Sequence, residues 1–252
     1  MSLNPMDLSG RTVLVTGASS GIGRATSILL SRLNAKVILV ARNTERLGET
    51  LSSLEGFGHH CEPFDLASLD AIPGWLKGVA SRHGLLDGAV HCAGTFGVVP
   101  LRTLTSTFLE RMLQVNLNAA IMLAKGLRQK GCHAERCSLV LISSVAGMRG
   151  HAALSAYTAT KAALIGVTKS LAMELAREGI RVNVVSPGVI ATEMAARAAE
   201  ETWGGTEELD AEHPLGIGHP LDVANGIAFL LSDAARWMTG ANLVIDGGYT
   251  AH

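Results

Sequence analysis

The stretch that decides the fold is Thr16-Gly17-Ala18-Ser19-Ser20-Gly21-Ile22-Gly23, which lies between the apolar run Thr12–Thr16 and a helical pattern that extends to about Leu33. In a strand–turn–helix unit, glycines let backbone N–H groups approach a pyrophosphate, and the helix N-terminus adds partial positive charge. The glycine spacing is GxxxGxG and no Lys-Ser/Thr pair follows it, so a nucleoside-triphosphate loop is not indicated. A purely structural turn is the alternative. The predicted dinucleotide contacts are Gly17, Ser19, Ser20, Gly21, Ile22 and Gly23.

The rest of the chain repeats this alternation of short apolar runs and longer helical stretches, which predicts a parallel sheet covered on both faces. The predicted strands are Thr12–Thr16, Lys36–Ala41, His59–Phe64, Leu86–His91, Ser138–Ser143, Arg181–Ser186 and Asn242–Ile245. The predicted helices are Gly21–Leu33, Thr44–Leu54, Leu69–His83, Leu104–Arg128, Ser155–Glu178 and Leu221–Ser232. We therefore expect one α/β domain over residues 1–252, a doubly wound Rossmann-like fold with seven parallel strands.

The least patterned region, residues 192–220, contains Trp203-Gly204-Gly205 and several acidic residues. It fits either a solvated surface loop or a substrate lid, because lids need glycine hinges and low local stability.

Composition narrows the class of protein. Hydrophobic residues make up 48% of the 252 residues and the net charge is −1, which indicates a well-buried chain without a preference for nucleic acid or anionic membranes. No apolar run reaches the roughly 18 residues of a membrane span. The four cysteines show no CxxC spacing, which favours a reducing cytoplasm and gives no metal site, although Cys132, His133 and Cys137 are close in sequence.

The end of the second strand predicts the cofactor. An acidic residue there would bind the ribose hydroxyls of NAD, but this chain has Ala41 followed by Arg42, and a guanidinium can pair with a 2′-phosphate. The sequence therefore favours NADP(H) over NAD(H), with a surface role for Arg42 as the alternative. Asp65, after the third strand, is expected near the adenine.

A second constellation predicts acid–base chemistry. Tyr157 and Lys161 stand four residues apart on a helical pattern and so share one face. A nearby ammonium stabilises phenolate and would lower the pKa of Tyr157 from about 10. Ser144 ends the preceding strand and Asn116 lies in the earlier long helix. The pair alone is a weak signal, and it gains meaning only beside the glycine turn.

These motifs together resemble the short-chain dehydrogenase/reductase family, of the roughly 250-residue type, over essentially the whole chain. The resemblance is nearest to the 3-oxoacyl-acyl-carrier-protein reductase-like branch. It rests on Thr16–Gly23, Asp65-Leu66, Ala93-Gly94, Asn116, Ile142-Ser143-Ser144, Tyr157 to Lys161, Ser186-Pro187-Gly188 with Thr192, and Asp246-Gly247-Gly248.

The resemblance implies hydride transfer between a nicotinamide and a carbonyl or alcohol. Tyr157 would be the acid or base, Lys161 would bind the nicotinamide ribose, and Ser144 would hold the substrate oxygen. Asn116 would anchor a water that links Lys161 to solvent. The remaining implied cofactor contacts are Leu66, Cys92, Ala93, Gly94, Pro187, Gly188, Ile190 and Thr192.

One position departs from the family pattern, because Cys92 stands where the family usually has asparagine. We interpret Cys92 as a small buried replacement; a reactive thiol is the alternative. Expected pocket walls are Val145, Met148, His151, Met194 and Trp203.

The apolar helices around residues 113–122 and 155–178 predict contact with a second subunit, and the resemblance implies a homotetramer. The alternatives to an NADP(H)-dependent carbonyl reductase are a sugar or polyol dehydrogenase, a nucleotide-sugar epimerase or dehydratase, and a non-catalytic dinucleotide sensor or scaffold.

Overall fold

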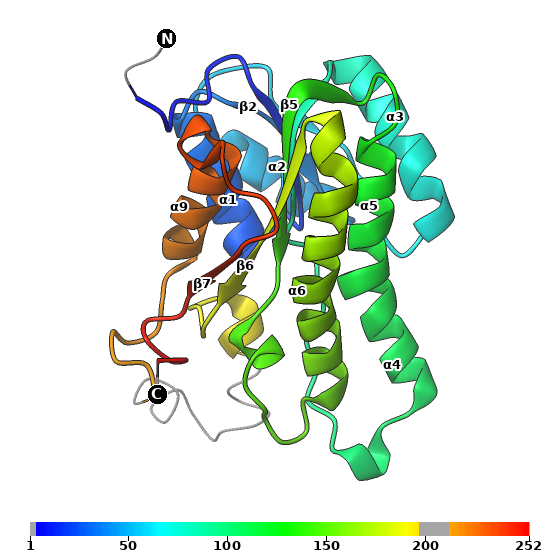
Figure 1. Ribbon diagram of the computed structural model, residues 1–252, viewed down its shortest axis with the longest axis vertical. Coiled ribbons are helices and arrows are strands. Elements are labelled where there is room, and N and C mark those ends of the chain that lie inside the picture. Colours follow the sequence, from blue (N-terminus) through cyan, green and yellow to red (C-terminus); the bar gives the residue numbers. More distant parts are fainter. Residues whose placement is uncertain (1–3, 197–211, 252) are drawn as a thin grey trace.

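The structure, a computed structural model, describes residues 4–196 and 212–251 (Figure 1). Its strands are β1 (Thr12–Thr16), β2 (Lys36–Val40), β3 (His60–Cys61), β4 (Leu86–His91), β5 (His133–Ile142), β6 (Ile180–Pro187) and β7 (Asn242–Ile245). Its α-helices include α1 (Gly21–Arg32), α2 (Thr44–Ser52), α3 (Ile72–His83), α4 (Ser106–Leu113), α5 (Ala119–Leu127), α6 (Ser155–Leu175) and α9 (Pro220–Leu231).

The seven strands form one parallel sheet in the order β3-β2-β1-β4-β5-β6-β7. The chain runs outward from β1 to β3, returns to place β4 beside β1, and then runs outward the other way. The predicted doubly wound, seven-stranded fold is confirmed. The reversal between β1 and β4 is the switch point at which such sheets bind ligands, outside the carboxyl ends of the strands.

Helices cover both faces of the sheet (Figure 1). Along β1, Val13 and Val15 are buried in a core that includes residues of α1 and α9, whereas Leu14 is buried in the core beneath α3, α5 and α6. Successive side chains of a strand point to opposite faces, so a strand buried on both sides must be apolar throughout. This constraint explains the unbroken run of buried residues in β1 and makes the sheet the rigid support of the site.

The long helix expected over residues 104–128 is wrong as a continuous α-helix. It divides into α4, a five-residue π-helix (Gln114–Asn118) and α5. The insertion coincides with Asn116, whose buried side chain bonds to the main chain of Thr95 outside the helix. Such π-helical segments are frequent at functional sites.

Two predicted strands also differ in length. The strand expected over residues 59–64 is only His60–Cys61, which pairs with β2 on one side as the edge of the sheet. β5 begins five residues earlier than expected, because His133 already pairs with Leu86 across an irregular register.

The ends of the region predicted as a loop or lid lie together. Ile190 forms a parallel bridge with Gly218, and the Ala191 N–H donates to the Gly218 carbonyl at 2.8 Å. Trp203 and the acidic residues Glu207, Glu208 and Asp210 lie outside the described residues, so the lid stays a prediction; Glu212 is described and lies 3.6 Å from the Arg149 guanidinium.

We expect Gly179→Ala to destabilise the fold by about 2–3 kcal/mol. Gly179 follows the last turn after α6 with φ +77°, and a Cβ atom there would lie 2.0 Å from the Glu135 carbonyl oxygen. Urea denaturation measures the loss. The control is Gly48→Ala in α2, where a Cβ meets nothing within 4 Å, and which should stabilise by about 0.5–1 kcal/mol. Equal effects of the two substitutions would contradict this account.

Candidate functional site

The predicted site residues gather at one edge of the sheet. The glycine turn follows β1, Cys92 to Gly94 follow β4, Ser144 follows β5, and Gly188 follows β6. Because these strands are neighbours in the parallel sheet, their carboxyl ends meet at the same edge. Arg42 and Asp65 follow β2 and β3, further along that edge.

The glycine turn is built by close backbone contact. Gly17 has φ +66°, and a Cβ atom on it would lie 2.8 Å from the Ala93 nitrogen. A Cβ atom on Gly23 would lie 2.3 Å from the Gly17 carbonyl oxygen, so neither position admits a side chain. The turn is therefore held against the segment that follows β4.

The start of α1 is arranged to accept an anion. Ser20 is the N-cap, its side chain makes no capping hydrogen bond, and the first turn carries no acidic residue. Thr192 lies against this turn, since its Cγ2 is 3.3 Å from the position of a Cβ on Gly21. Uncapped N–H groups at a helix N-terminus are a ready anion site, so this cradle fits a pyrophosphate.

Arg42 is exposed, and no carboxylate of the described residues lies within 4.0 Å of its guanidinium. Nearby Arg46 instead pairs with Glu193, which joins α2 to the segment after Thr192.

Asp65 is exposed, and its carboxylate accepts from the Ala67 N–H at 3.0 Å.

Two predicted cofactor contacts have buried side chains. Leu66 and Ile190 are each about 6% exposed and belong to the two hydrophobic cores. Only the main chain of these residues is therefore available to a ligand.

Lys161 is a buried ammonium at the centre of the site. It projects from the buried face of α6, and its Nζ donates to the Ile142 carbonyl at 2.8 Å. Nζ also lies 3.8 Å from the position of a Cβ on Gly94, so the missing side chain there leaves room for it. Burial lowers the pKa of Lys161 to about 8, which still leaves most molecules charged at neutral pH.

Tyr157 lies beside this ammonium, with Lys161 Nζ 5.5 Å from the centroid of its ring. Burial raises the pKa of the Tyr157 phenol to about 12, and a hydrogen bond with Ser144 opposes the rise. The expected lowering of this pKa by Lys161 is therefore wrong for the protein as described. Desolvation sets the direction of the shift, and the hydrogen bond of the Lys161 ammonium goes to the Ile142 carbonyl.

The Asn116 side chain is fully engaged. Its Oδ1 accepts from the Thr95 N–H at 2.7 Å, and its Nδ2 donates to the Thr95 carbonyl at 3.0 Å and to Thr160 Oγ1 at 3.2 Å. Asn116 thus fixes the segment after Gly94, and any water anchored by this residue would use its main chain.

His91, a buried histidine that the sequence analysis missed, lies at the end of β4 near Lys161. His91 Nδ1 lies 3.2 Å from Thr16 Oγ1, which accepts from the Ala93 N–H at 3.1 Å. Burial, and secondly the charge of Lys161, lower the pKa of His91 to about 4, against the opposing effect of the Val115 main chain. His91 is therefore neutral and braces the glycine turn. Only its position at the end of β4 could have signalled this role.

Burial likewise raises the pKa of Cys92 to about 12. The thiol is neutral at physiological pH, which favours the interpretation of Cys92 as a packing residue over that of a reactive nucleophile.

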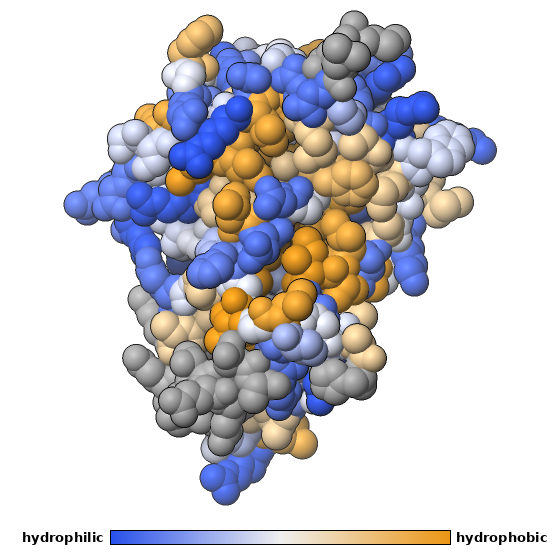
Figure 2. Space-filling view, turned by 90° about the vertical axis from the view of Figure 1, so that its left-hand side faces the viewer, coloured by the Kyte–Doolittle hydropathy of each residue, from blue (hydrophilic) through white to orange (hydrophobic). Residues whose placement is uncertain are grey.

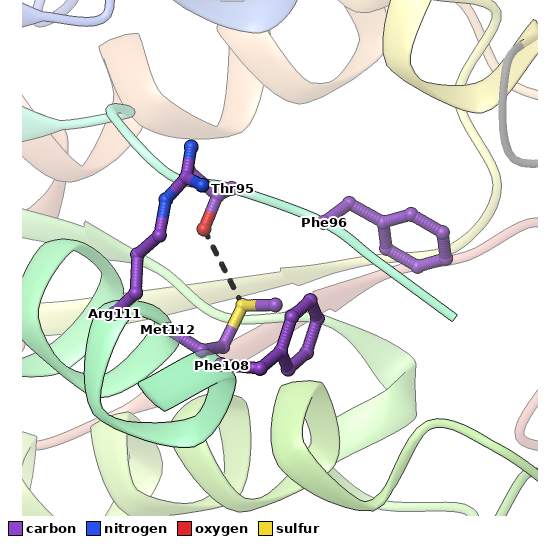
Figure 3. Close-up of a pocket in the computed structure, with 5 residues that line it drawn as sticks. All are labelled: Thr95, Phe96, Phe108, Arg111 and Met112. Carbon is purple, nitrogen blue, oxygen red and sulfur yellow. Dashed lines mark hydrogen bonds between the residues drawn. The ribbon is translucent and has the colours of Figure 1, made fainter. Parts of the chain in front are cut away.

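An aromatic residue that was also missed links the site to a cavity. Phe96 packs edge-to-face on Tyr157, with ring centroids 4.9 Å apart. It is one wall of a cavity of about 130 Å³, whose other walls come from the same loop and from α4 (Figure 3). The remaining lining residues are Thr95, Phe108, Arg111 and Met112.

Of the expected pocket walls, Val145 is buried, whereas Met148 and Met194 are about half exposed. His151 is tied to the C-terminal segment, since its Nε2 lies 3.1 Å from the Tyr249 hydroxyl. The Tyr249 ring also stacks on His213, whose Nε2 accepts from the Val189 N–H. Tyr249 therefore joins three segments around the site, a long-range role that no local pattern signals.

A family model described as enoyl-(acyl carrier protein) reductase matches residues 17–250. This chain is a member of the short-chain dehydrogenase/reductase family. It is 36% identical over 245 residues to a 3-oxoacyl-[acyl-carrier-protein] reductase of Rickettsia prowazekii, with 96% of this chain and 98% of the relative covered. It is 35% identical over 262 residues to (+)-borneol dehydrogenase 2 of Salvia officinalis, with 98% and 92% covered.

Solved structures agree with this placement in the family. A short-chain dehydrogenase/reductase of Brucella melitensis, described as a glucose/ribitol dehydrogenase, is 31% identical with a TM-score of 0.89 over 96% of this chain and 98% of that one. A candidate 2-deoxy-d-gluconate 3-dehydrogenase of Agrobacterium tumefaciens, with bound NADP, is 31% identical with a TM-score of 0.86 over 99% and 100%. As a member of this family, the chain is an oxidoreductase that acts on alcohol or carbonyl substrates with a nicotinamide dinucleotide.

Two further observations concern residues 4–196 and 212–251. No group of three or more histidine, cysteine or acidic side chains there is placed to hold a metal ion. No helix in these ranges is both long enough and apolar enough to cross a bilayer.

We expect His91 to make this reductase-family fold sensitive to acid. Its pKa of about 4 in the folded protein lies below the unfolded value of 6.5, so the unfolded state binds more protons between these values. The contribution of His91 to the free energy of unfolding is complete above pH 6.5. It is lost as the pH falls toward 4, and the total loss is about 3 kcal/mol.

Urea denaturation of the wild type and of His91→Asn at pH 7 and pH 4 tests this expectation. The loss of stability between the two pH values should be smaller in the variant. The matched control is His133→Asn at the amino end of β5, which should keep the wild-type loss. Parallel losses in all three proteins would refute the assignment.

Proposed function

We propose that the protein is an NADP(H)-dependent reductase of carbonyl compounds, which also oxidises secondary alcohols in the reverse direction. The observation that carries the proposal is the convergence of Tyr157, Ser144 and the buried Lys161 ammonium beside an uncapped glycine turn. A non-catalytic dinucleotide sensor would not need a phenol and an ammonium held together in this way.

In this mechanism the dinucleotide supplies or accepts the hydride at the substrate carbon. Ser144 donates a hydrogen bond that holds the carbonyl oxygen, and Tyr157 gives its phenol proton to that oxygen. A pKa near 12 keeps Tyr157 protonated before reaction, as an acid must be. The Lys161 ammonium stabilises the phenolate that remains, and a proton from solvent restores the phenol.

The residues that would hold the cofactor form a continuous track. The turn from Gly17 to Gly23 would take the pyrophosphate, Asp65 and the backbone of Cys92 to Gly94 the adenosine half, and Lys161 the nicotinamide ribose. The backbone of Pro187 to Thr192 would orient the carboxamide.

The preference for NADP(H) rests on Arg42. Its guanidinium is exposed and unpaired among the described residues, and Ala41 brings no carboxylate to repel a 2′-phosphate. The relative with bound NADP lends support to the same preference.

The substrate class is proposed as a ketone or 3-oxoacyl thioester. The relatives are named for different substrates, as a 3-oxoacyl-[acyl-carrier-protein] reductase, a borneol dehydrogenase and a glucose/ribitol dehydrogenase. A substrate panel should therefore contain a 3-oxoacyl thioester, a cyclic ketone and a sugar or polyol, each assayed with NADPH and NADH.

We further propose that the protein is a homotetramer and is located in the cytoplasm. The side of the molecule that carries α9 gathers hydrophobic residues (Figure 2), and Leu215, Leu221 and Trp237 are exposed there and in the flanking segments. Ile121 on α5 and Met173 on α6 are exposed on other helices. These exposed apolar side chains support an assembly of more than one subunit.

We expect Tyr157→Phe to reduce turnover of the best substrate by at least about a hundredfold, because the proton donor is lost. Cofactor affinity, measured by nicotinamide fluorescence, should stay within about threefold, since the ring and its packing on Phe96 are kept. Unchanged turnover in the variant would sink the enzymatic assignment.

We expect Arg42→Ala to weaken NADPH binding by about ten- to a hundredfold and to leave NADH binding nearly unchanged, because only NADPH carries the 2′-phosphate. Fluorescence titration of both cofactors measures the change. Arg32→Ala, which removes an arginine paired with Glu55 at the far end of α1, is the control. Tighter binding of NADH than NADPH by the wild type would contradict the cofactor assignment.

A further inference from the structure

The cavity beside Tyr157 has a catalytic end and a cationic end. In Figure 3 the Phe96 ring lies at one end of the lining group and the Arg111 guanidinium at the other, with Phe108 and Met112 between them. The Phe96 ring contacts Tyr157, so the cavity begins one aromatic ring away from the reacting group.

The middle of the cavity is apolar and of limited size. Phe108 and Met112 offer an aromatic ring and a thioether, and Thr95 turns its hydroxyl toward the Met112 sulfur at 3.4 Å. Gly97 keeps the space for Phe108, because a Cβ atom there would lie 2.8 Å from the Phe108 ring. A volume of about 130 Å³ is close to the roughly 150 Å³ known to accommodate benzene, so the space suits a short hydrocarbon arm.

The cationic end carries an uncompensated charge. Arg111 is exposed on α4, and no carboxylate of residues 4–196 or 212–251 lies within 4.0 Å of its guanidinium. An arginine binds carboxylates and phosphates through paired N–H groups, so a cavity that combines the Phe108 and Met112 side chains with the polar groups of Thr95 and Arg111 can take both an apolar arm and an anion.

We propose that this cavity is a specificity subsite for carbonyl substrates that carry an anionic group on a short apolar arm. The carbonyl would lie at Tyr157, the arm would pass Phe96 and lie over Phe108 and Met112, and the anion would pair with Arg111. This proposal rests on the proposed carbonyl reductase activity and adds to it a class of substrate, the oxo-carboxylates and their phosphate counterparts.

The test compares 5-oxohexanoate with its methyl ester, two ketones that differ in the charge at the end of the same arm. The variants are Arg111→Gln, Arg111→Lys and the control Arg102→Gln, which alters an exposed arginine of the loop outside the cavity lining. We expect Arg111→Gln to lower kcat/KM for the acid at least about tenfold and to leave the ester within about twofold. Arg111→Lys should recover part of the loss, and Arg102→Gln should resemble the wild type.

A second variant tests the apolar part independently of charge. Phe108→Trp enlarges the ring that lines the cavity, so it should slow reduction of both the acid and the ester; unchanged rates for both would overturn the placement of the arm. Equal losses for acid and ester in Arg111→Gln, or no loss for the acid, would overturn the subsite. A weaker NADPH affinity in Arg111→Gln would also overturn it, because Arg111 would then serve the cofactor.

Calorimetry can measure the affinity of the acid for the protein saturated with NADP⁺. This measurement needs no turnover, so it tests the subsite separately from the proposed enzymatic activity. If no ketone is reduced by the wild type, the enzymatic assignment fails, and the subsite is still judged by binding. An acid affinity that falls about tenfold in Arg111→Gln and declines with added salt supports it. An affinity that is equal in the two proteins refutes it.

Discussion

The contact between the turn after β1 and the segment after β4 is the constraint on which the rest of the site depends. Gly17 lies so close to the Ala93 main chain that a Cβ atom would approach within 2.8 Å, and Thr16 accepts a hydrogen bond from the same residue. This contact fixes the start of α1 beside Gly94. Gly94 in turn leaves space for the Lys161 ammonium and the Asn116 amide. One backbone approach thus sets the relative positions of the anion-binding turn and the acid–base pair.

The electrostatics of the site follow from burying one cation there. The Lys161 ammonium donates a hydrogen bond to the Ile142 carbonyl, and burial lowers its pKa to about 8, so part of the stability of the charge is lost. A second buried cation beside it would be still more costly, so His91 is neutral and serves as a hydrogen-bonding brace. Tyr157 is neutral for the opposite reason, because desolvation disfavours phenolate. The protein alone therefore presents one cation and one undissociated acid, a pairing suited to protonating a carbonyl oxygen.

Much of this could be predicted from the sequence, because apolar runs and glycine spacing report local structure. The doubly wound parallel sheet followed from periodicity, and the association of Gly17, Ser144 and Tyr157 followed from their motifs. The π-helix at Asn116 could not be predicted, since it accompanies a hydrogen bond to Thr95 that is distant in sequence. The direction of the Tyr157 pKa was also missed, because desolvation is set by tertiary packing. The same holds for Tyr249, whose partners Arg149 and His151 come from one segment and His213 from another, all distant in sequence.

Residues at the strand ends and residues that line the cavity are positioned in different ways, and this difference bears on substrate specificity. The glycine turn, the Cys92 to Gly94 segment and Ser144 stand where strands end, and Tyr157 and Lys161 lie on α6 beside them, so the sheet and α6 position these residues and their motifs reveal them. The cavity walls instead come from the loop after β4 and from α4, whose geometry depends on how Phe96, Phe108 and Met112 pack together. The π-helix joins α4 to α5 and contains Asn116. One helical segment therefore carries a wall of the cavity at α4 and, at Asn116, the side chain that fixes the Thr95 main chain. Side chains of this loop and of α4 can therefore change without disturbing the strand ends, because they depend on local packing and not on the sheet.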